Sequence, residues 1–125
     1  MLIKIPASFG ELVDKLTILR IKESRLEGEA RDNVVKELQE LQKSVKENGL
    51  KLDESDLLEL QRINQMLWDI EDAIRAKEAQ QTFDADFIEL ARSVYKWNDK
   101  RAALKRSFSK RYGSELIEEK RYTTY

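Results

Sequence analysis

Two long segments of this chain carry the spacing of apolar residues that lets helices pack side by side, and only a short loop separates them. Residues 54–79 have apolar side chains at steps of three and four positions, at Leu60, Ile63, Leu67, Ile70 and Ile74. Residues 84–111 repeat these steps at Phe87, Leu90, Val94, Trp97, Arg101, Leu104 and Phe108. Each segment has about 26 residues, or about 39 Å as an α-helix. The pattern predicts two long helices of matched length.

The connection over residues 80–83 is so short that the two helices must be antiparallel neighbours. Residues that face each other in such a hairpin have numbers that add up to a constant. Four apolar pairs add up to 164: Ile74 with Leu90, Ile70 with Val94, Leu67 with Trp97, and Leu60 with Leu104. Twice the loop midpoint gives about 163. The apolar pattern and the loop position therefore predict the same register.

Two further helices precede this hairpin. The first is expected over residues 8–27, because Ser8-Phe-Gly-Glu11 matches a capping box. The second is expected over residues 30–48, with a narrow apolar seam and with Asn48-Gly49 as its stop.

The ends of the chain add smaller elements. Residues 2–7 read as an extended arm, and a short helix is expected over residues 115–120 after Gly113. The sequence thus predicts one all-α domain over residues 1–125, an antiparallel long helix hairpin within a three- or four-helix bundle. The thin core and the surplus of aromatic residues favour a homodimer.

Cysteine and histidine are both absent. Disulfides, zinc sites with thiolate or imidazole ligands, and serine or cysteine nucleophiles paired with histidine are therefore excluded. Acid–base chemistry would fall to carboxylates, Lys or Tyr, and a metal would need oxygen ligands. The net charge of −1 predicts no polyanionic partner.

The sequence shows no targeting segment. No stretch approaches the roughly 18 apolar residues of a membrane span, and acidic residues follow soon after the first few positions. We therefore expect a cytoplasmic protein with no membrane partner.

Arg101 occupies a seam position where an apolar residue is expected. It is predicted to face Ile63, with Glu59 and Arg62 nearby. It either contacts an anion or ligand, or pairs with a carboxylate such as Glu59, and the second interpretation is favoured. Polar residues also line the edges of the seam, where ordinary flanking charges are favoured over a polar pocket: Asn64, Glu71, Glu78, Asn98 and Lys105.

Two pairs of acids three positions apart suggest a metal-dependent alternative. Glu37 and Glu40 lie on one predicted helix, and Asp69 and Asp72 lie on another. If the pairs faced each other they could hold Mg²⁺, as in all-helical nucleotide hydrolases. In a chain this rich in acids, such pairs also arise by chance.

The second half of the 84–111 helix is strongly basic. Residues 96–111 hold seven bases against one acid, Asp99. A surface that binds phosphate or nucleic acid is a weaker alternative, because bases at the carboxyl end of a helix also suit the helix dipole. We do not expect nucleic acid as the partner.

Four blocks carry a family resemblance: IPASFGELVDKLTILRIK at 5–22, DIEDAIRAKEA at 69–79, NDKRAALKR at 98–106 and GSELIEEK at 113–120. Together they resemble a family of small bacterial and phage proteins that is classed as a domain of unknown function. The resemblance implies a single helical domain with no assigned activity, cofactor or catalytic residue. From the thin core and the surplus of aromatic residues we expect a helical interaction or assembly module that acts through a partner, without catalysis or cofactor of its own.

Overall fold

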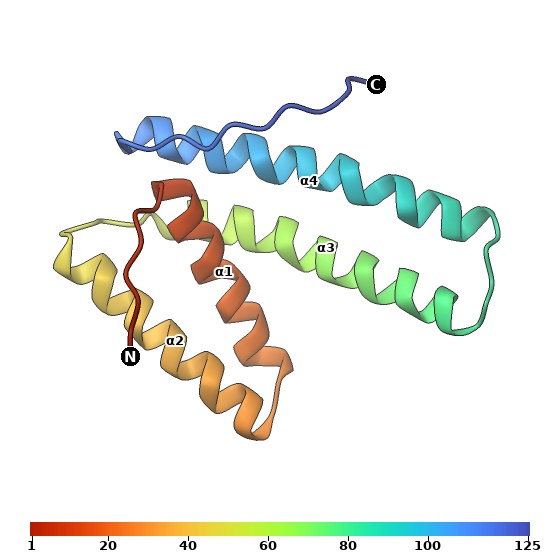
Figure 1. The fold of residues 1–125 in the computed structure, drawn as a ribbon, viewed down its shortest axis with the longest axis horizontal. Coiled ribbons are helices and arrows are strands. Elements are labelled where there is room, and N and C mark those ends of the chain that lie inside the picture. The colour runs from red at the N-terminus through yellow and green to blue at the C-terminus, as the bar shows by residue number, and fades with distance from the viewer.

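A computed structural model describes all of residues 1–125 and contains four helices and no strand. The helices are α1 (Phe9–Arg25), α2 (Gly28–Glu47), α3 (Glu54–Ala79) and α4 (Ala85–Arg111), as Figure 1 shows. The all-α prediction is confirmed, and the helix boundaries differ from the predicted ones by no more than two residues. None of the four helices combines the length and apolar character needed to cross a lipid bilayer.

The two longest helices, α3 and α4, form the antiparallel hairpin (Figure 1). Near the loop, Lys77 Nζ lies 2.8 Å from Asp84 Oδ2. At the open end, Arg111 Nη2 lies 2.6 Å from Asp56 Oδ2. The residue numbers of these two pairs add up to 161 and 167, on either side of the predicted 164. The structure therefore agrees with the register derived from the apolar pattern.

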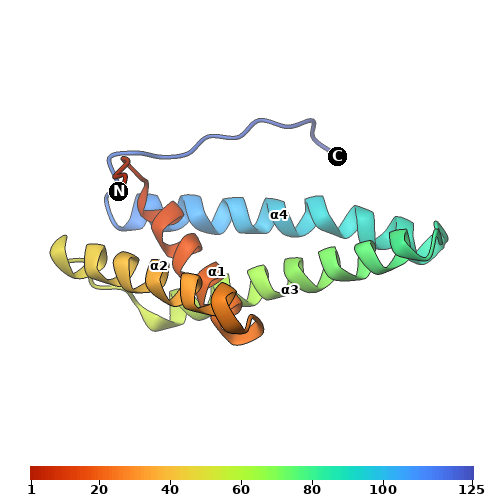
Figure 2. The same cartoon turned by 60° about the horizontal axis from the view of Figure 1, so that its bottom comes forward.

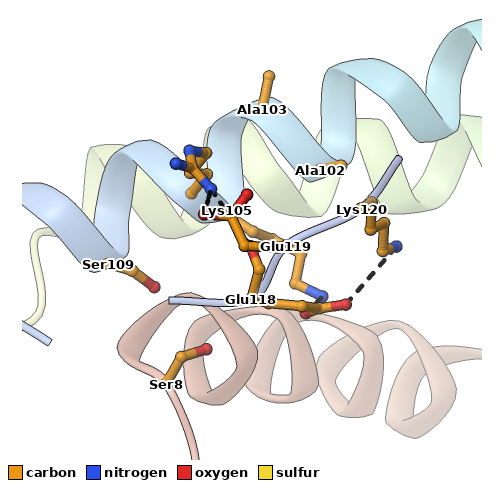
Figure 3. Close-up of a pocket in the computed structure, with 9 residues that line it drawn as sticks. Ser8, Ala102, Ala103, Lys105, Ser109, Glu118, Glu119 and Lys120 are labelled. Carbon is orange, nitrogen blue, oxygen red and sulfur yellow. Dashed lines mark hydrogen bonds and ion pairs between the residues drawn. The ribbon is translucent and has the colours of Figure 1, made fainter. Parts of the chain in front are cut away.

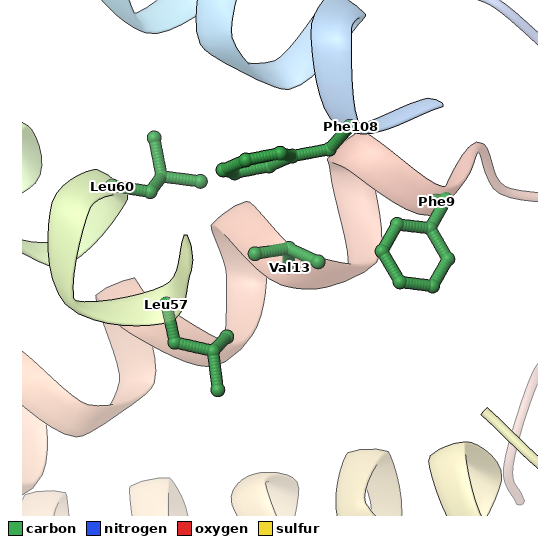
Figure 4. Close-up of a cluster of buried hydrophobic side chains, with 5 residues drawn as sticks. All are labelled: Phe9, Val13, Leu57, Leu60 and Phe108. Carbon is green, nitrogen blue, oxygen red and sulfur yellow. The ribbon is translucent and has the colours of Figure 1, made fainter. Parts of the chain in front are cut away.

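Helix α1 crosses the hairpin and contacts both of its helices, whereas α2 packs only against α1. One apolar cluster joins α1 to the open end of the hairpin and consists of Phe9, Val13, Leu57, Leu60 and Phe108 (Figure 4). A second cluster joins α1 to α2 and consists of Leu16, Leu19, Val34 and Leu38. The bundle therefore has a core of α1, α3 and α4, with α2 added on the far side of α1.

The loop end of the hairpin extends beyond α1 and α2 (Figure 1). We call residues 71–97 the outer half of the hairpin. None of these residues is buried, although the predicted seam runs through them. Two helices alone shield one narrow seam between them, so this part of the protein has no complete core.

The predicted short helix over residues 115–120 is wrong. Gly113 has a φ of 70° and ends α4, and the chain then runs back beside α4 without helical structure (Figure 2). Glu118 and Glu119 contact Lys105 and Arg106 of α4. A six-residue helix gains too little from its own hydrogen bonds to form alone, and the extended path lets both carboxylates reach α4.

Candidate functional site

The site is built where the first turn of α1 meets the end of α4. Gly10 lies so close to α4 that an added Cβ atom would be 2.3 Å from the carbonyl oxygen of Lys105. Three serine hydroxyls accept hydrogen bonds from the first amides of α1. Ser114 binds the amide of Phe9 at 3.1 Å, Ser109 that of Gly10 at 2.9 Å, and Ser8 that of Glu11 at 3.1 Å. These bonds satisfy amides that a helix start leaves without partners, and they fix the crossing point.

One turn further along α1, Asp14 is turned inward against both helices of the hairpin. Its side chain is 2% exposed, and Arg101 of α4 donates two hydrogen bonds to it, from Nε at 2.9 Å and from Nη2 at 2.5 Å. Asn64 of α3 donates a third, at 2.9 Å, and also donates to the hydroxyl of Thr17. We call Asp14, Thr17, Asn64, Arg101 and Lys105 the Asp14 cluster.

Lys105 completes the cluster. Its ammonium lies 2.8 Å from Glu11, 3.3 Å from Glu118 and 3.7 Å from Asp14. The predicted capping box is thus only half formed, because Ser8 caps the amide of Glu11 while the Glu11 carboxylate binds Lys105 instead of the cap amide. The carboxylates offset the cost of burying an ammonium group.

The cluster keeps Asp14, Arg101 and Lys105 in their charged forms. Burial would raise the pKa of Asp14, but hydrogen bonds from Arg101 and Asn64 and the positive charges of Arg101 and Lys105 outweigh it, so the pKa lies below its usual value. Burial would lower the pKa of Lys105, but Glu11 and the other nearby carboxylates raise it above the ordinary value. Asp14, Arg101 and Lys105 are therefore ions at neutral pH, held together with the neutral side chains of Thr17 and Asn64.

A groove of about 450 Å³ opens beside the cluster, between α1 and the hairpin. Its apolar lining comes from Ile18, Ile21, Leu67 and Trp68. Its polar lining comes from Asn64, Asn98 and Arg101 near the cluster, and from Glu71, Asp72 and Arg75 towards the loop end. Its volume lies within the range of small-molecule sites, and four of its ten lining residues are hydrophobic.

A smaller pocket of about 240 Å³ lies on the other side of Lys105 (Figure 3). Ser8 and Ser109 line it, together with Lys105 and Arg106. The carboxylates of Glu118 and Glu119 already lie against those bases, so the chain's own C-terminal segment supplies the anions at this point.

Comparison with known proteins places the chain in a family. The model of a family described as a family of unknown function (DUF6165) matches residues 3–125. The chain belongs to the DUF6165 family. No curated protein and no solved structure matches it. The predicted family resemblance is confirmed, and DUF6165 brings no assigned activity with it.

Arg101, the seam residue singled out from the sequence, does pair with a carboxylate in this DUF6165 chain. The partner is Asp14 of α1 rather than Glu59 of α3. The suggestion of Glu59 was wrong because the register of the hairpin relates only α3 and α4. It cannot predict a partner on α1, which crosses both helices. Of the polar residues at the edges of the seam, Asn64, Glu71 and Asn98 line the groove, whereas Glu78 and Lys105 do not.

The two acid pairs are not brought together in this DUF6165 chain. Glu37 of α2 binds Lys15 at 3.0 Å, and Asp69 of α3 binds Arg25 at 2.7 Å. Glu40 is exposed on α2, which does not contact α3, and Asp72 lies at the groove. No group of three or more carboxylates is close enough to hold a metal ion. The magnesium alternative therefore has no site on these residues.

The basic residues of α4 do not form one free surface. Four of the seven are bound to acids within the chain: Arg101 to Asp14, Lys105 to Glu11, Arg106 to Glu119, and Arg111 to Asp56. Lys100 lies over the ring of Trp97, 4.3 Å from its centroid. The phosphate-binding alternative therefore gains no support from the structure.

Sequence reasoning missed Asp14 as a site residue, although a signal was present. Gly10, Asp14, Thr17 and Ile21 step by 4, 3 and 4 positions along α1 and form a seam of their own. An acid and a threonine in such a seam, together with Arg101 in the seam of α4, indicate a buried polar layer in this chain.

Proposed function

We propose that the chain is a helical assembly module that acts by binding and not by catalysis, and that its partner is a second copy of itself. The observation that carries this proposal is the outer half of the hairpin. Across residues 71–97 no side chain is buried, yet the seam residues Ile74, Leu90, Val94 and Trp97 are large and apolar. An apolar seam that two helices leave half covered is completed when another helix pair packs on it.

Exposed apolar side chains lie in the same region. Phe83 and Ile88 are 52% and 54% exposed, and Tyr95, seven residues after Ile88, shares a face of α4 with it. The ring of Tyr95 packs against Tyr125, whereas Phe83 and Ile88 stay more than half exposed, and exposed large apolar residues at one end of a helix pair indicate an interaction surface.

The distribution of charge favours a second copy in antiparallel orientation. Residues 71–89 carry two bases, Arg75 and Lys77, against six acids: Glu71, Asp72, Glu78, Asp84, Asp86 and Glu89. Residues 92–97 carry two bases, Arg92 and Lys96, and no acid. When two outer halves lie antiparallel, the acidic end of each meets the basic stretch of the other.

The test is the mass of the protein in solution, measured by light scattering after size-exclusion chromatography. The wild-type chain should have twice the 14.7 kDa of one copy. Ile88→Glu should shift the equilibrium to the monomer, because it places a charge on the apolar face. Leu58→Glu is the matched control, since Leu58 is 48% exposed but lies on α3 outside the outer half. It should leave the dimer intact.

Salt gives a second measurement. Because opposite charges contribute to the proposed contact, the dimer should dissociate more readily as ionic strength rises. A wild-type chain that is monomeric at every concentration, or a Leu58→Glu variant that dissociates as readily as Ile88→Glu, would show that the outer half is not the contact surface.

A further inference from the structure

The groove between α1 and the hairpin shares only Glu71, Asp72 and Arg75 with the outer half of the hairpin and has its own chemistry. It is bounded by Ile18 and Ile21 on α1 and follows α3 from Asn64 to Arg75, about 16 Å along the helix axis. Its volume of about 450 Å³ falls within the range of about 300–1,000 Å³ in which proteins bind small molecules.

Arg101 enters this groove already oriented. Asp14 binds the edge of the Arg101 guanidinium that Nε and Nη2 form. Nη1 makes no hydrogen bond within the chain, and the Arg101 side chain remains 26% exposed. A guanidinium has five N–H donors, so the edge formed by Nη1 and the second N–H of Nη2 is free. Two parallel N–H groups on one edge match the two oxygens of a carboxylate.

Two asparagines extend this end of the groove. Asn64 is 5% exposed, and its amide nitrogen donates to Asp14 and Thr17, while its carbonyl oxygen accepts no hydrogen bond within the chain. Asn98 also lines the groove, and its side chain makes no hydrogen bond within the chain. Polar groups that are held at the end of an apolar groove without partners suit a ligand that carries both donors and acceptors.

The opposite end sets a limit on the charge of the ligand. Glu71 and Asp72 lie there, with Arg75 3.9 Å from Glu71. These acids disfavour a second negative charge at that end, so a dianion would be repelled. Between the two ends the lining is apolar and aromatic, from Ile18, Ile21, Leu67 and Trp68.

We propose that this groove binds a small monocarboxylate with an apolar body, whose carboxylate lies on the free edge of Arg101 beside Asn98. The apolar body then lies against Ile18 and the ring of Trp68. Because Asp14 fixes the guanidinium before the ligand arrives, little side-chain entropy is lost on binding. The proposal does not depend on self-association.

The experiment uses two probes that differ only at the polar end, 4-phenylbutyrate and its neutral amide. Binding is followed by the indole N–H signal of Trp68 in ¹H–¹⁵N NMR spectra, which is distinguished from that of Trp97 by the variant Trp97→Phe. The carboxylate should shift the Trp68 signal to saturation, and the amide should bind at least about tenfold more weakly, since it loses the charge-assisted pair.

Variants then locate the contact. Asn98→Ala should weaken binding of the carboxylate about fivefold, because one hydrogen bond is lost. Asn33→Ala on α2 is the matched control and should bind as the wild type does. Arg101→Lys should lose most binding, since Lys keeps a charge for Asp14 but has no second edge. If Arg101→Lys does not fold, the comparison of Asn98→Ala with Asn33→Ala decides.

Two results would overturn the proposal. One is the absence of any saturable shift of the Trp68 signal with the carboxylate. The other is binding that is unchanged in Asn98→Ala or equally strong for the amide. The oligomeric state of Ile88→Glu tests the assembly proposal separately, so failure of one proposal leaves the other open to its own test.

Discussion

Arg101 of α4 and Asp14 of α1 are 87 positions apart in the sequence and share two hydrogen bonds, at 2.9 and 2.5 Å. Asp14 also binds Asn64 of α3, so its carboxylate joins the three helices of the core at one point. Because buried charges are costly unless they are paired, this contact specifies one way for α1 to cross the hairpin.

Asp14→Asn should destabilise the protein by about 3 kcal/mol at neutral pH, because it leaves Arg101 and the nearly buried Lys105 without their shared counter-charge. Urea unfolding followed by circular dichroism measures the difference. The difference in stability between the wild type and Asp14→Asn also depends on pH. The folded pKa of Asp14 lies below the ordinary 3.8, so its stabilising effect is complete above that value and is lost as pH falls through the folded pKa.

The stability of the wild type should therefore fall towards Asp14→Asn as the pH drops below about 4. A gap between the two proteins that stays constant from pH 7 down to the acid transition would mean that the carboxylate is not stabilised as described.

Ser109→Ala should cost about 2 kcal/mol, because it leaves the buried amide of Gly10 without an acceptor. Ser107→Ala is the control on the same helix. Ser107 is exposed and its hydroxyl donates only to the Leu104 carbonyl, so this change should be neutral or slightly stabilising. Thermal unfolding of both variants tests whether the serine contacts at the start of α1 hold the crossing; equal effects would argue against it.

Gly10→Ala should destabilise the protein by about 3 kcal/mol, although alanine is the better helix former by about 1 kcal/mol. The added methyl group would meet the Lys105 carbonyl at 2.3 Å, and backbone atoms cannot turn away. Gly28 has a φ of 63° and open space around it, so Gly28→Ala strains the backbone without a steric clash. This change should lower the free energy of unfolding by only about 1 kcal/mol. A Gly10→Ala variant as stable as the wild type in urea would show that α1 and α4 do not approach so closely.

The sequence was sufficient for the hairpin and insufficient for the site, for a physical reason. The register of α3 and α4 follows from a repeated local spacing and one short loop, so residues such as Leu67 and Trp97 could be paired in advance. Arg101 could be recognised as unusual for the same reason. The seam of α1 that holds Gly10 and Asp14 can be read from local spacing, but the angle at which α1 crosses the hairpin cannot, so Asp14 could not be assigned as the partner of Arg101.

The C-terminal segment is a second case in which the local sequence did not predict the structure. Ser114 and the residues up to Lys120 have the composition of a short helix, and local propensity predicts one. Contacts with Lys105 and Arg106, on a helix that ends earlier in the chain, instead favour an extended path. Tertiary contacts override propensity most easily in short segments, where helix formation gains little.

Gln61 of α3 gives the last prediction, because its Oε1 atom is buried and has no hydrogen-bond partner. A buried acceptor without a donor costs about 1–3 kcal/mol. Gln61→Met keeps the length of the side chain and removes that atom, so it should stabilise the protein by about 1 kcal/mol and raise Tm by about 4 °C.

Gln65→Met is the control, because Gln65 lies one turn further along α3, is half-buried and has no buried atom without a partner. It should have little effect on Tm. If scanning calorimetry shows the same Tm change for both, general hydrophobicity explains it; a loss of stability confined to Gln61→Met would mean that the Gln61 oxygen has a partner in solution.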